Sequence, residues 1–391
     1  MSKSRLESLN FSGTAPRSQE HSWNTGVALY IHWPFCVSKC PYCDFNSHVR
    51  ASIDQAAWRD ALLADLAHEA RAWPGGPLAS IFFGGGTPSL MEPTTVAALI
   101  AAAERHWGLS PDVEITLEAN PSSVETARFA DLAAAGVSRV SLGLQSLDDS
   151  ALRFLGRAHG VAEGLAALET AQRHFGRVSF DLIYALPGQS EAAWEAELTR
   201  ALGFGTGHLS LYQLTIEPGT RFAALAAKGA FAEKDPDEAA SLYELTQALA
   251  EAAGLPAYEI SNHARAGEES RHNLAYWRYR PYLGIGPGAH GRRGGAATLR
   301  HRKPENFLSA LARNGSGLAE ETPLAPADQA RERLLMGLRL REGVPLEGIL
   351  SVLDLAAVER LERQGLVRRD SGRLYAAEPL LLDGILAEIA A

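Results

Sequence analysis

The chain has 391 residues, 46% of them hydrophobic, and a formal net charge of −9. This length is sufficient for one large domain and a second, smaller one, whereas the acidic balance argues against a general nucleic-acid-binding protein, so we expect no nucleic-acid partner. Three cysteines are too few for a disulfide framework, and neither an apolar run of about 18 residues nor a signal-peptide pattern is present, so we expect a cytoplasmic protein.

Residues 1–26, rich in Ser, Asn and charge, predict a flexible tail. Residues 27–255 alternate short β-type runs with long amphipathic segments, which is the pattern of strand–helix units that build a parallel sheet. Six such units predict an α/β fold with a partial (β/α)6 barrel. The strands are expected near 27–32, 79–83, 113–118, 139–145, 178–184 and 208–214, and the helices near 54–73, 92–107, 123–135, 148–175 (broken near Gly160), 190–204 and 235–253.

The alternation of side chains within these strands predicts a polar lumen. In the segment 113–118 every second residue is apolar, and the intervening positions end at Glu118. The strands that contribute Gln145 and Asp181 alternate in the same way, so these polar residues face away from the helices. Any one of them alone is explained as well by an ordinary strand-terminal cap, but together they fit a site at the C-terminal end of a barrel.

All three cysteines lie in one short stretch, spaced Cys36-x3-Cys40-x2-Cys43. Iron–sulfur clusters are normally bound by four cysteines, so a cubane held by three leaves one iron open to a non-protein ligand. A structural zinc site needs four ligands and would borrow His32 or His48 as the fourth. Inert thiols are the third alternative, and the x3–x2 spacing favours the cluster.

The cysteine spacing, with Tyr42 before the third cysteine, resembles the signature of the radical S-adenosylmethionine (SAM) superfamily. The resemblance implies a 4Fe–4S cluster whose open iron chelates SAM, which is cleaved to a 5′-deoxyadenosyl radical. The glycine run after the second strand resembles the SAM-contacting turn of that family, although ordinary turns also use glycine. The SAM contacts that the resemblance implies are Tyr30, Gly85, Gly86, Thr87, Glu118, Gln145, Arg157 and Asp181.

Residues 256–325 predict a basic linker region with a second site. Between Arg265 and Lys303 there are nine Lys or Arg residues and two acidic ones, which suits an anionic ligand or a solvated face. This region contains the motif His-Asn-x-x-Tyr-Trp, in which His272 looks accessible and lies beside two aromatic residues. Such a group can bind haem through the imidazole, although a structural, hydrogen-bonded histidine is the commoner case.

Together these motifs resemble the oxygen-independent coproporphyrinogen dehydrogenase (HemN) lineage, and the motif at His272 resembles its haem-chaperone branch. The resemblance implies a protein that binds a 4Fe–4S cluster, SAM and haem and passes haem to acceptor apoproteins. The alternative is an oxygen-independent coproporphyrinogen III oxidase of porphyrin biosynthesis, but that enzyme carries a further cysteine where this chain has Phe45. Peripheral membrane contact and a homodimer are left open by the sequence.

Residues 326–391 predict a C-terminal winged-helix-like domain of the HemN type. An amphipathic helix at 326–340, two helical segments within 345–366 and a hairpin at 366–375 precede a last helix at 380–390. The segment is not clearly basic, so a lid or a docking surface for a protein partner is favoured over nucleic-acid binding.

Overall fold

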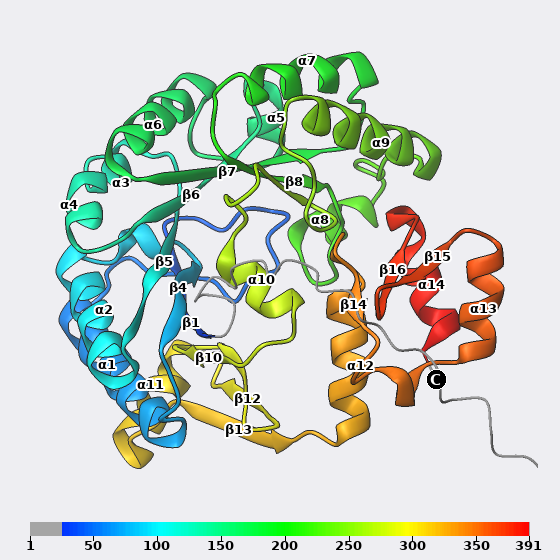
Figure 1. Ribbon diagram of the computed structural model, residues 1–391. Helices are drawn as coiled ribbons and strands as arrows, with labels where there is room; N and C mark the ends of the chain where they lie inside the picture. The colour runs from blue at the N-terminus through cyan, green and yellow to red at the C-terminus, as the bar shows by residue number, and fades with distance from the viewer. Residues whose placement is uncertain (1–25, 391) are drawn as a thin grey trace, which may run out of the picture.

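The computed structural model describes residues 26–390, so the tail expected at the N-terminus lies, except for Gly26, outside the described residues. Its main feature is a curved 11-stranded sheet (Figure 1). Six parallel strands lie side by side in chain order, which confirms the predicted α/β fold and its six strand–helix units. They are β1 (Val27–Trp33), β4 (Leu78–Gly85), β5 (Leu109–Ala119), β6 (Arg139–Gln145), β7 (Arg177–Tyr184) and β8 (His208–Gln213).

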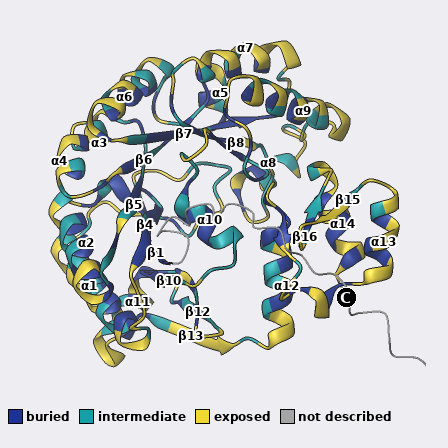
Figure 2. Cartoon of the chain, in the orientation of Figure 1, coloured by how far each residue is buried: buried dark blue, intermediate teal, exposed yellow. Residues whose placement is uncertain are grey.

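Helices cover the convex face of this sheet (Figure 1). Their inward sides are buried and their outward sides exposed, as amphipathic sequences require (Figure 2). Several begin at a side-chain cap, such as Asp54 or Ser190, whose oxygen accepts a backbone N–H of the first turn. The helices between the parallel strands are α1 (Gln55–Ala72), α2 (Pro93–Trp107), α3 (Ser123–Thr126), α4 (Phe129–Ala134), α5 (Asp149–Phe154), α6 (Val161–His174) and α7 (Glu191–Leu202), followed after β8 by α8 (Arg221–Ala226) and α9 (Pro236–Ala252).

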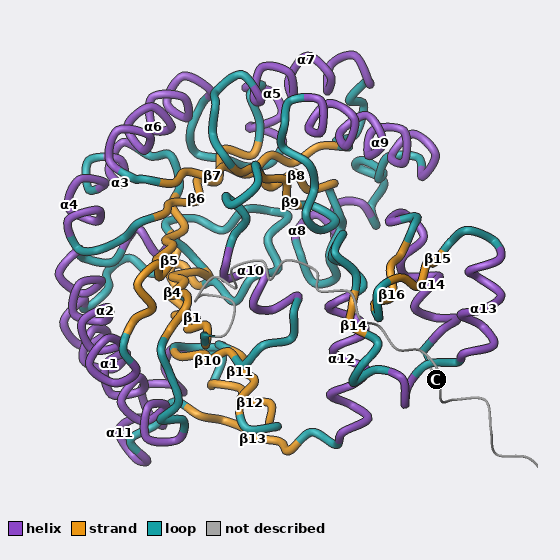
Figure 3. Tube along the Cα trace, viewed as in Figure 1, coloured by secondary structure: helices purple, strands orange, loops and turns teal. Residues whose placement is uncertain are grey.

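Residues 256–325 are not a linker, which corrects the sequence-based expectation. They extend the sheet at both edges, as the tube in Figure 3 shows for the lower edge. At one edge β9 (Asn262–Ala264) pairs antiparallel with β8, and at the other β10 (Tyr282–Ile285) pairs parallel with β1. Beyond β10 lie the antiparallel strands β11 (His290–Arg293), β12 (Ala296–Arg300) and β13 (Leu318–Pro323), with α11 (Pro304–Asn314) between the last two.

The concave side of the sheet is occupied by the short helix α10 (Arg271–Trp277) (Figure 1). Because α10 packs there, the polar faces of the strands are buried as well as the apolar ones. Glu114 and Thr116 on β5 are 2% and 0% exposed. The predicted polar lumen is therefore present, but part of it is filled by the protein's own chain.

The C-terminal domain has its own core and stands beside the open side of the curved sheet (Figure 1). Its three-stranded sheet has the order β14–β16–β15, and the hairpin predicted at 366–375 is confirmed with Ser371 and Gly372 at its turn. The elements are α12 (Pro326–Gly337), β14 (Val344–Pro345), α13 (Leu355–Arg363), β15 (Val367–Asp370), β16 (Arg373–Ala376) and α14 (Leu382–Ile389). Three helices and a short sheet agree with the winged-helix-like prediction.

Candidate functional site

The three cysteines lie on one loop at the C-terminal end of β1. Cys36 ends the short strand β2 (Phe35–Cys36), which pairs with β3 (His48–Val49), and Cys40 and Cys43 lie between these strands. All three are half-buried, and burial raises the pKa of the Cys36 and Cys43 thiols. A hydroxyl and a guanidinium donate to the sulfurs: Thr87 Oγ1 lies 3.4 Å from Cys36 Sγ, and Arg157 Nη1 lies 3.4 Å from Cys40 Sγ.

The donor set fits a cluster better than it fits a single ion. The thiols of Cys40 and Cys43 are close enough to Cys36 to raise its pKa, yet no three His, Cys, Asp or Glu side chains within residues 26–390 converge on a single-ion site. A cubane binds each thiolate at a separate corner and does not require such convergence. The buried Ser47 hydroxyl near these cysteines has no hydrogen-bond partner among the described residues, so a donor is available there.

The histidines considered as a fourth zinc ligand are engaged elsewhere. The His32 ring nitrogens contact Tyr30 OH at 2.9 Å and the Asn46 carbonyl at 2.9 Å. His48 Nε2 lies 3.3 Å from the Asn46 side-chain oxygen. With both ring nitrogens of His32 occupied, the structure gives no support to a zinc site that includes it.

Arg157 links the cysteine loop to the end of the sheet. Its Nη2 donates to Asn120 Oδ1 at 2.6 Å and to the Gly143 carbonyl at 2.9 Å, and Asn120 in turn donates to Thr87 Oγ1 at 3.1 Å. Arg157 Nε is buried without a partner among the described residues, so the guanidinium retains a donor for a ligand. Asn120 was missed by the sequence analysis, although it lies two positions after Glu118 and therefore has the same strand parity.

The backbone near Gln145 is adapted to this arrangement. A Cβ at Gly143 would lie 2.8 Å from the Gln145 side-chain nitrogen and 3.4 Å from Arg157 Nη2, so only glycine leaves room for them. Gln145 itself has φ 69°, a left-handed conformation that is unfavourable for a residue with a side chain. Backbone strain of this kind is concentrated at functional sites.

The glycine run at the end of β4, Gly84 to Gly86, is explained first by packing. A Cβ at Gly84 would lie 2.8 Å from the Tyr30 ring, and one at Gly86 would lie 2.6 Å from the Phe35 carbonyl oxygen. Gly85 has φ +112°, and a Cβ there would lie 2.5 Å from the His32 ring. The three glycines therefore allow the end of β4 to pass against β1 and β2, whereas the sequence analysis attributed them to ligand contact.

Two carboxyl groups face the lumen from neighbouring parts of the sheet. Burial, followed by the charge of Asp181, raises the pKa of Glu118 to about 8, and the Gly85 N–H donates to Glu118 at 3.1 Å. Burial also raises the pKa of Asp181 to about 6, and Ser141 donates to it at 3.4 Å. Buried carboxyl groups with strongly shifted pKa values that lie near one another are typical of binding sites.

A cavity of about 420 Å³ opens beside Glu118. Tyr30, Gly85 and Glu118, three of the predicted SAM contacts, line it together with Phe45 and Tyr276. Phe45 is 58% exposed and lies at the mouth of this cavity. This is the position where, from the family resemblance, the dehydrogenase carries a further cysteine. The volume of the cavity falls within the range of small-molecule sites, about 300–1,000 Å³.

His272 is not accessible, which corrects the expectation from its loop context. It is 1% exposed at the start of α10, with Nδ1 2.9 Å from Ser80 Oγ and Nε2 3.0 Å from Tyr276 OH. Its ring stacks on Phe82 with centroids 4.8 Å apart. Burial, followed by the charge of Arg139, lowers the pKa of His272 to about 3, so the ring is neutral and holds α10 in the lumen.

The basic stretch expected to attract an anion is largely neutralised by distant acidic residues. Arg293 and Arg300 on β11 and β12 pair with Glu69 on α1, and Arg300 also contacts Asp65 at 3.4 Å. Arg300, Asp65 and Glu69 are completely buried. These arginines attach the strand extension, β10–β13, to the helical layer. Other arginines of the basic stretch pair as Arg271–Asp112, Arg278–Glu342 and Arg292–Glu332.

Comparison with known proteins identifies two family models in the chain. Residues 30–201 match the radical SAM superfamily, and residues 324–378 match the HemN C-terminal domain. The described part of the chain, residues 26–390, contains no helix that combines the length and apolar character needed to cross a bilayer.

Similar proteins cover most of the chain. Radical S-adenosyl methionine domain-containing protein 1, mitochondrial, of Bos taurus is 40% identical over 91% of this chain and 84% of its own length. The heme chaperone HemW is 37% identical in Mycobacterium tuberculosis (91% of this chain, 90% of that protein) and 38% identical in Escherichia coli K12 (82% and 84%). The solved structure of coproporphyrinogen III oxidase (HemN) from Escherichia coli superimposes with a TM-score of 0.78 at 23% identity, covering 93% of this chain and 90% of that one, which shows a shared fold. The chain therefore belongs to the HemW heme-chaperone family of radical SAM proteins.

Proposed function

We propose that this protein is a haem chaperone: it binds a 4Fe–4S cluster, SAM and haem, and transfers haem to acceptor apoproteins. The observation that carries the proposal is the similarity to HemW proteins over 82–91% of the chain. Phe45 at the mouth of the cavity supports it, since a phenyl ring supplies neither a proton nor a thiol for decarboxylation. A cytoplasmic location, and contact with a second copy or a membrane surface, remain predictions.

The cluster is proposed to bind Cys36, Cys40 and Cys43, where it would supply the electron and the open iron for SAM. Around the cluster, charged and polar side chains of the chain are proposed to contact SAM. Arg157 offers its remaining donor to a carboxylate, and Glu118 offers acceptors to an ammonium or a ribose hydroxyl. The remaining proposed contacts are Tyr30, Gly85, Gly86, Thr87, Gln145 and Asp181.

For His272 we propose a positioning role in haem binding. Direct iron ligation requires it to leave Ser80 or Tyr276, because each ring nitrogen already has a partner. Replacement of His272 by Ala separates the two roles. A positioning role predicts weaker haem binding with an unchanged absorption spectrum of the residual complex, whereas loss of an axial ligand changes that spectrum.

The proposed function is tested by haem transfer under anaerobic conditions. The reconstituted protein is loaded with haemin and mixed with apomyoglobin, and the Soret band is followed as haem moves to the acceptor. We expect transfer from this protein to be faster than from haemin-loaded serum albumin at equal concentration. A protein that binds no haemin, or transfers none, is not a chaperone.

The competing function is tested with coproporphyrinogen III, SAM and a reductant. The fold shared with HemN motivates the experiment. We expect no protoporphyrinogen to form. Multiple turnovers per protein molecule would reject the chaperone proposal in favour of the oxidase.

A further inference from the structure

The cavity of about 420 Å³ beside Glu118, which we define as the lumen cavity, has an inner end and a mouth. Tyr30 and Glu118, two of the proposed SAM contacts, are half-buried, whereas the lining residues Phe45, His290 and Arg302 are exposed. We infer that haem binds at this mouth, with the His290 imidazole as the ligand of its iron and Arg302 as the contact of a propionate. The inference rests on the proposed function and gives the haem a location beside the proposed SAM contacts.

His290 is a histidine of the lumen cavity whose ring has no protein partner. It begins β11 and lines the cavity, and its ring makes no hydrogen bond or ion pair within residues 26–390. His32, which also lines the cavity, has both ring nitrogens occupied, by Tyr30 and by the Asn46 carbonyl. Imidazole is a common axial ligand of haem iron. His290 can therefore bind iron without breaking an existing contact, and His32 cannot.

The tyrosines of the lumen cavity are poorer candidates for the iron ligand. The hydroxyl groups of Tyr30 and Tyr276 are engaged by ring nitrogens of His32 and His272, at 2.9 and 3.0 Å. Burial raises the pKa of the Tyr282 phenol, which disfavours the phenolate that coordinates ferric iron. An imidazole binds a metal as the neutral ring, so a histidine ligand needs no such deprotonation.

Arg302 supplies positive charge at the mouth. Its backbone carbonyl accepts a hydrogen bond from the Asn46 side chain, but its guanidinium makes no hydrogen bond or ion pair with the described residues. Burial, followed by the charges of Arg292 and Arg302, lowers the pKa of His290, which shows that both guanidinium groups lie near the ring. Because Arg292 already pairs with Glu332, Arg302 is the group that can meet a propionate of a haem bound at His290.

Aromatic surface for the macrocycle lies beside these two polar groups. Phe45 on the cysteine loop is 58% exposed, and the rings of Tyr276 and Tyr282 meet edge to face with centroids 4.3 Å apart. All three line the cavity. Aromatic side chains at a cavity mouth are suited to pack against a flat ligand. The mouth therefore combines an apolar surface, an iron ligand and a cation, as haem requires.

Asn46 fixes the walls of the mouth relative to each other. Its side-chain nitrogen donates to the Pro287 and Arg302 carbonyls, at 2.9 Å each, so the cysteine loop is joined to the turn before β11 and to the loop after β12. Gly288 has φ +82°, and a Cβ there would clash with the same nitrogen, so glycine is needed where the turn passes Asn46. The mouth is therefore formed before a ligand binds.

The buried His272 is connected to this site through Tyr276. Its Nε2 lies 3.0 Å from Tyr276 OH, and the Tyr276 ring lines the lumen cavity against Tyr282. Loss of the imidazole would release the tyrosine that forms part of the apolar surface. The positioning role proposed for His272 therefore has a physical path to the haem.

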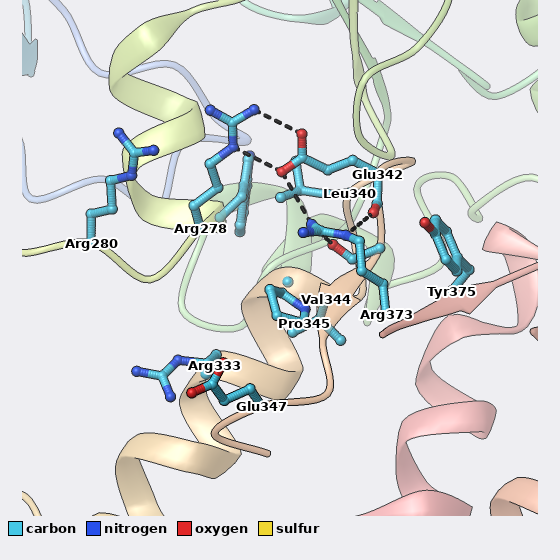
Figure 4. A pocket seen from close by; sticks show the side chains of 13 residues that line it. Arg278, Arg280, Arg333, Leu340, Glu342, Val344, Pro345, Glu347, Arg373 and Tyr375 are labelled. Carbon is cyan, nitrogen blue, oxygen red and sulfur yellow. Dashed lines mark hydrogen bonds and ion pairs between the residues drawn. The ribbon is translucent and has the colours of Figure 1, made fainter. Parts of the chain in front are cut away.

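A larger cavity lies between α10 and the C-terminal domain, and it lacks these features (Figure 4). Its volume is about 620 Å³, and no His, Cys or Met is among the described residues that line it. Arg278 and Arg373 both contact Glu342 there, as the dashed lines show. This cavity offers haem iron neither an imidazole nor a sulfur ligand, so the lumen cavity is the better site despite its smaller volume.

The first test measures ferric haemin binding by the full chain with the cluster reconstituted. His290→Ala is expected to change the absorption and EPR spectra of the bound haem and to lower haemin affinity roughly tenfold, and free imidazole should restore the spectra. His301→Ala is the matched control. The His301 carbonyl accepts from the Gly288 N–H at 3.0 Å, so this residue lies beside the same turn, but it does not line the cavity. Unchanged spectra for His290→Ala, or an equal change for His301→Ala, would overturn the ligand assignment.

The second test isolates the propionate contact. Arg302→Gln is expected to lower haemin affinity roughly tenfold. It should leave the affinity for haemin dimethyl ester unchanged, because the ester has no free carboxylate. Lys303→Gln removes the neighbouring exposed cation, which does not line the cavity, and should affect neither ligand. Equal haemin affinities for Arg302→Gln and the unmodified protein would overturn this contact.

These measurements separate the inference from the proposed function. SAM affinity and the EPR signal of the cluster should stay unchanged in both variants, since neither residue is a proposed SAM contact or a cluster ligand. If the unmodified protein binds haemin but neither variant alters its spectra or affinity, the inference is overturned while the proposed function stands. Failure of the unmodified protein to bind haemin overturns both.

Discussion

Arg157 donates from Nη1 to the Sγ of Cys40 across 3.4 Å, so this arginine of the α5–α6 loop reaches the cysteine loop directly. The same guanidinium binds Asn120 and the Gly143 carbonyl, which fixes the position of the loop relative to the sheet end. The proposed cluster and SAM sites would therefore be coupled through this one side chain.

Replacement of Arg157 by Lys tests this coupling. Lysine keeps the charge but lacks the planar fork that serves Cys40, Asn120 and a ligand at the same time. We expect SAM affinity to fall roughly tenfold to a hundredfold, the cost of a charged hydrogen bond, with an iron content near that of the unmodified protein. Isothermal titration measures the affinity, with Arg153→Lys, exposed on α5, as the control. Equal SAM affinity for both variants would falsify the assigned role.

Glu118→Gln separates stability from ligand binding. The pKa of Glu118 is raised from its usual 4.5 to about 8, so the folded state retains a proton that the unfolded state has lost. Its stabilising contribution is complete below pH 4.5 and is lost as the pH rises through about 8. At pH 8 the unfolding free energy of the Gln variant should therefore exceed that of the unmodified protein by about 1 kcal/mol or more. Denaturant unfolding measures this difference.

SAM binding by Glu118→Gln should change in the opposite direction. Above the raised pKa of about 8, at about pH 9, Glu118 is ionised and offers two acceptor oxygens and a charge, whereas glutamine offers one acceptor oxygen and no charge. SAM affinity at that pH is therefore expected to fall roughly tenfold. Asp149→Asn, an exposed carboxyl on α5, serves as the control for both measurements. A variant that is less stable at pH 8, or that binds SAM as tightly as the unmodified protein, contradicts the assignment.

Glu69→Gln tests the buried ion pairs that hold the strand extension. Arg300 is completely buried and contacts Glu69 at 2.5 Å, so the substitution leaves a buried guanidinium undercompensated. We expect a loss of about 3–5 kcal/mol in unfolding free energy. Asp328→Asn, in the exposed pair with Arg331, should cost less than about 1 kcal/mol. If urea unfolding showed similar losses of unfolding free energy for Glu69→Gln and Asp328→Asn, burial of the ion pair would not determine the cost of breaking it.

The sequence was sufficient for the six parallel strands because alternation and length are local properties. It was not sufficient for β9–β13, because these strands have only three to six residues, and the charged side chains of β11, β12 and β13 have partners elsewhere in the chain. Arg293 and Glu69 are 224 positions apart. No local pattern indicates that an arginine-rich stretch is neutralised by a helix near the start of the chain.

At the site, too, the features that depend on local sequence were predicted, and those that depend on distant parts of the chain were not. The polar strand ends predicted Glu118 and Asp181 as site residues, and the structure places the two carboxyl groups in one interior region. The glycine run was interpreted as a ligand contact, but Gly86 is required first by its distance to Phe35. The position of His272 depends on α10 entering the lumen, which only the tertiary structure reveals.

The burial of His272 predicts a dependence of stability on pH. Its pKa is lowered from the usual 6.5 to about 3, so between these values the unfolded state binds a proton that the folded state does not. The unfolding free energy therefore decreases as the pH falls from about 6.5 toward 3, with up to about 1.4 kcal/mol per pH unit from this one group. His272→Gln removes the titrating ring, and denaturant unfolding at a series of pH values should show a slope smaller by about that amount. His174→Gln, at the exposed end of α6, is the control variant for the same series of measurements. If His272→Gln kept the full slope, the histidine would be exposed to protons in the folded protein, and its assigned role of holding α10 as a neutral ring would be wrong.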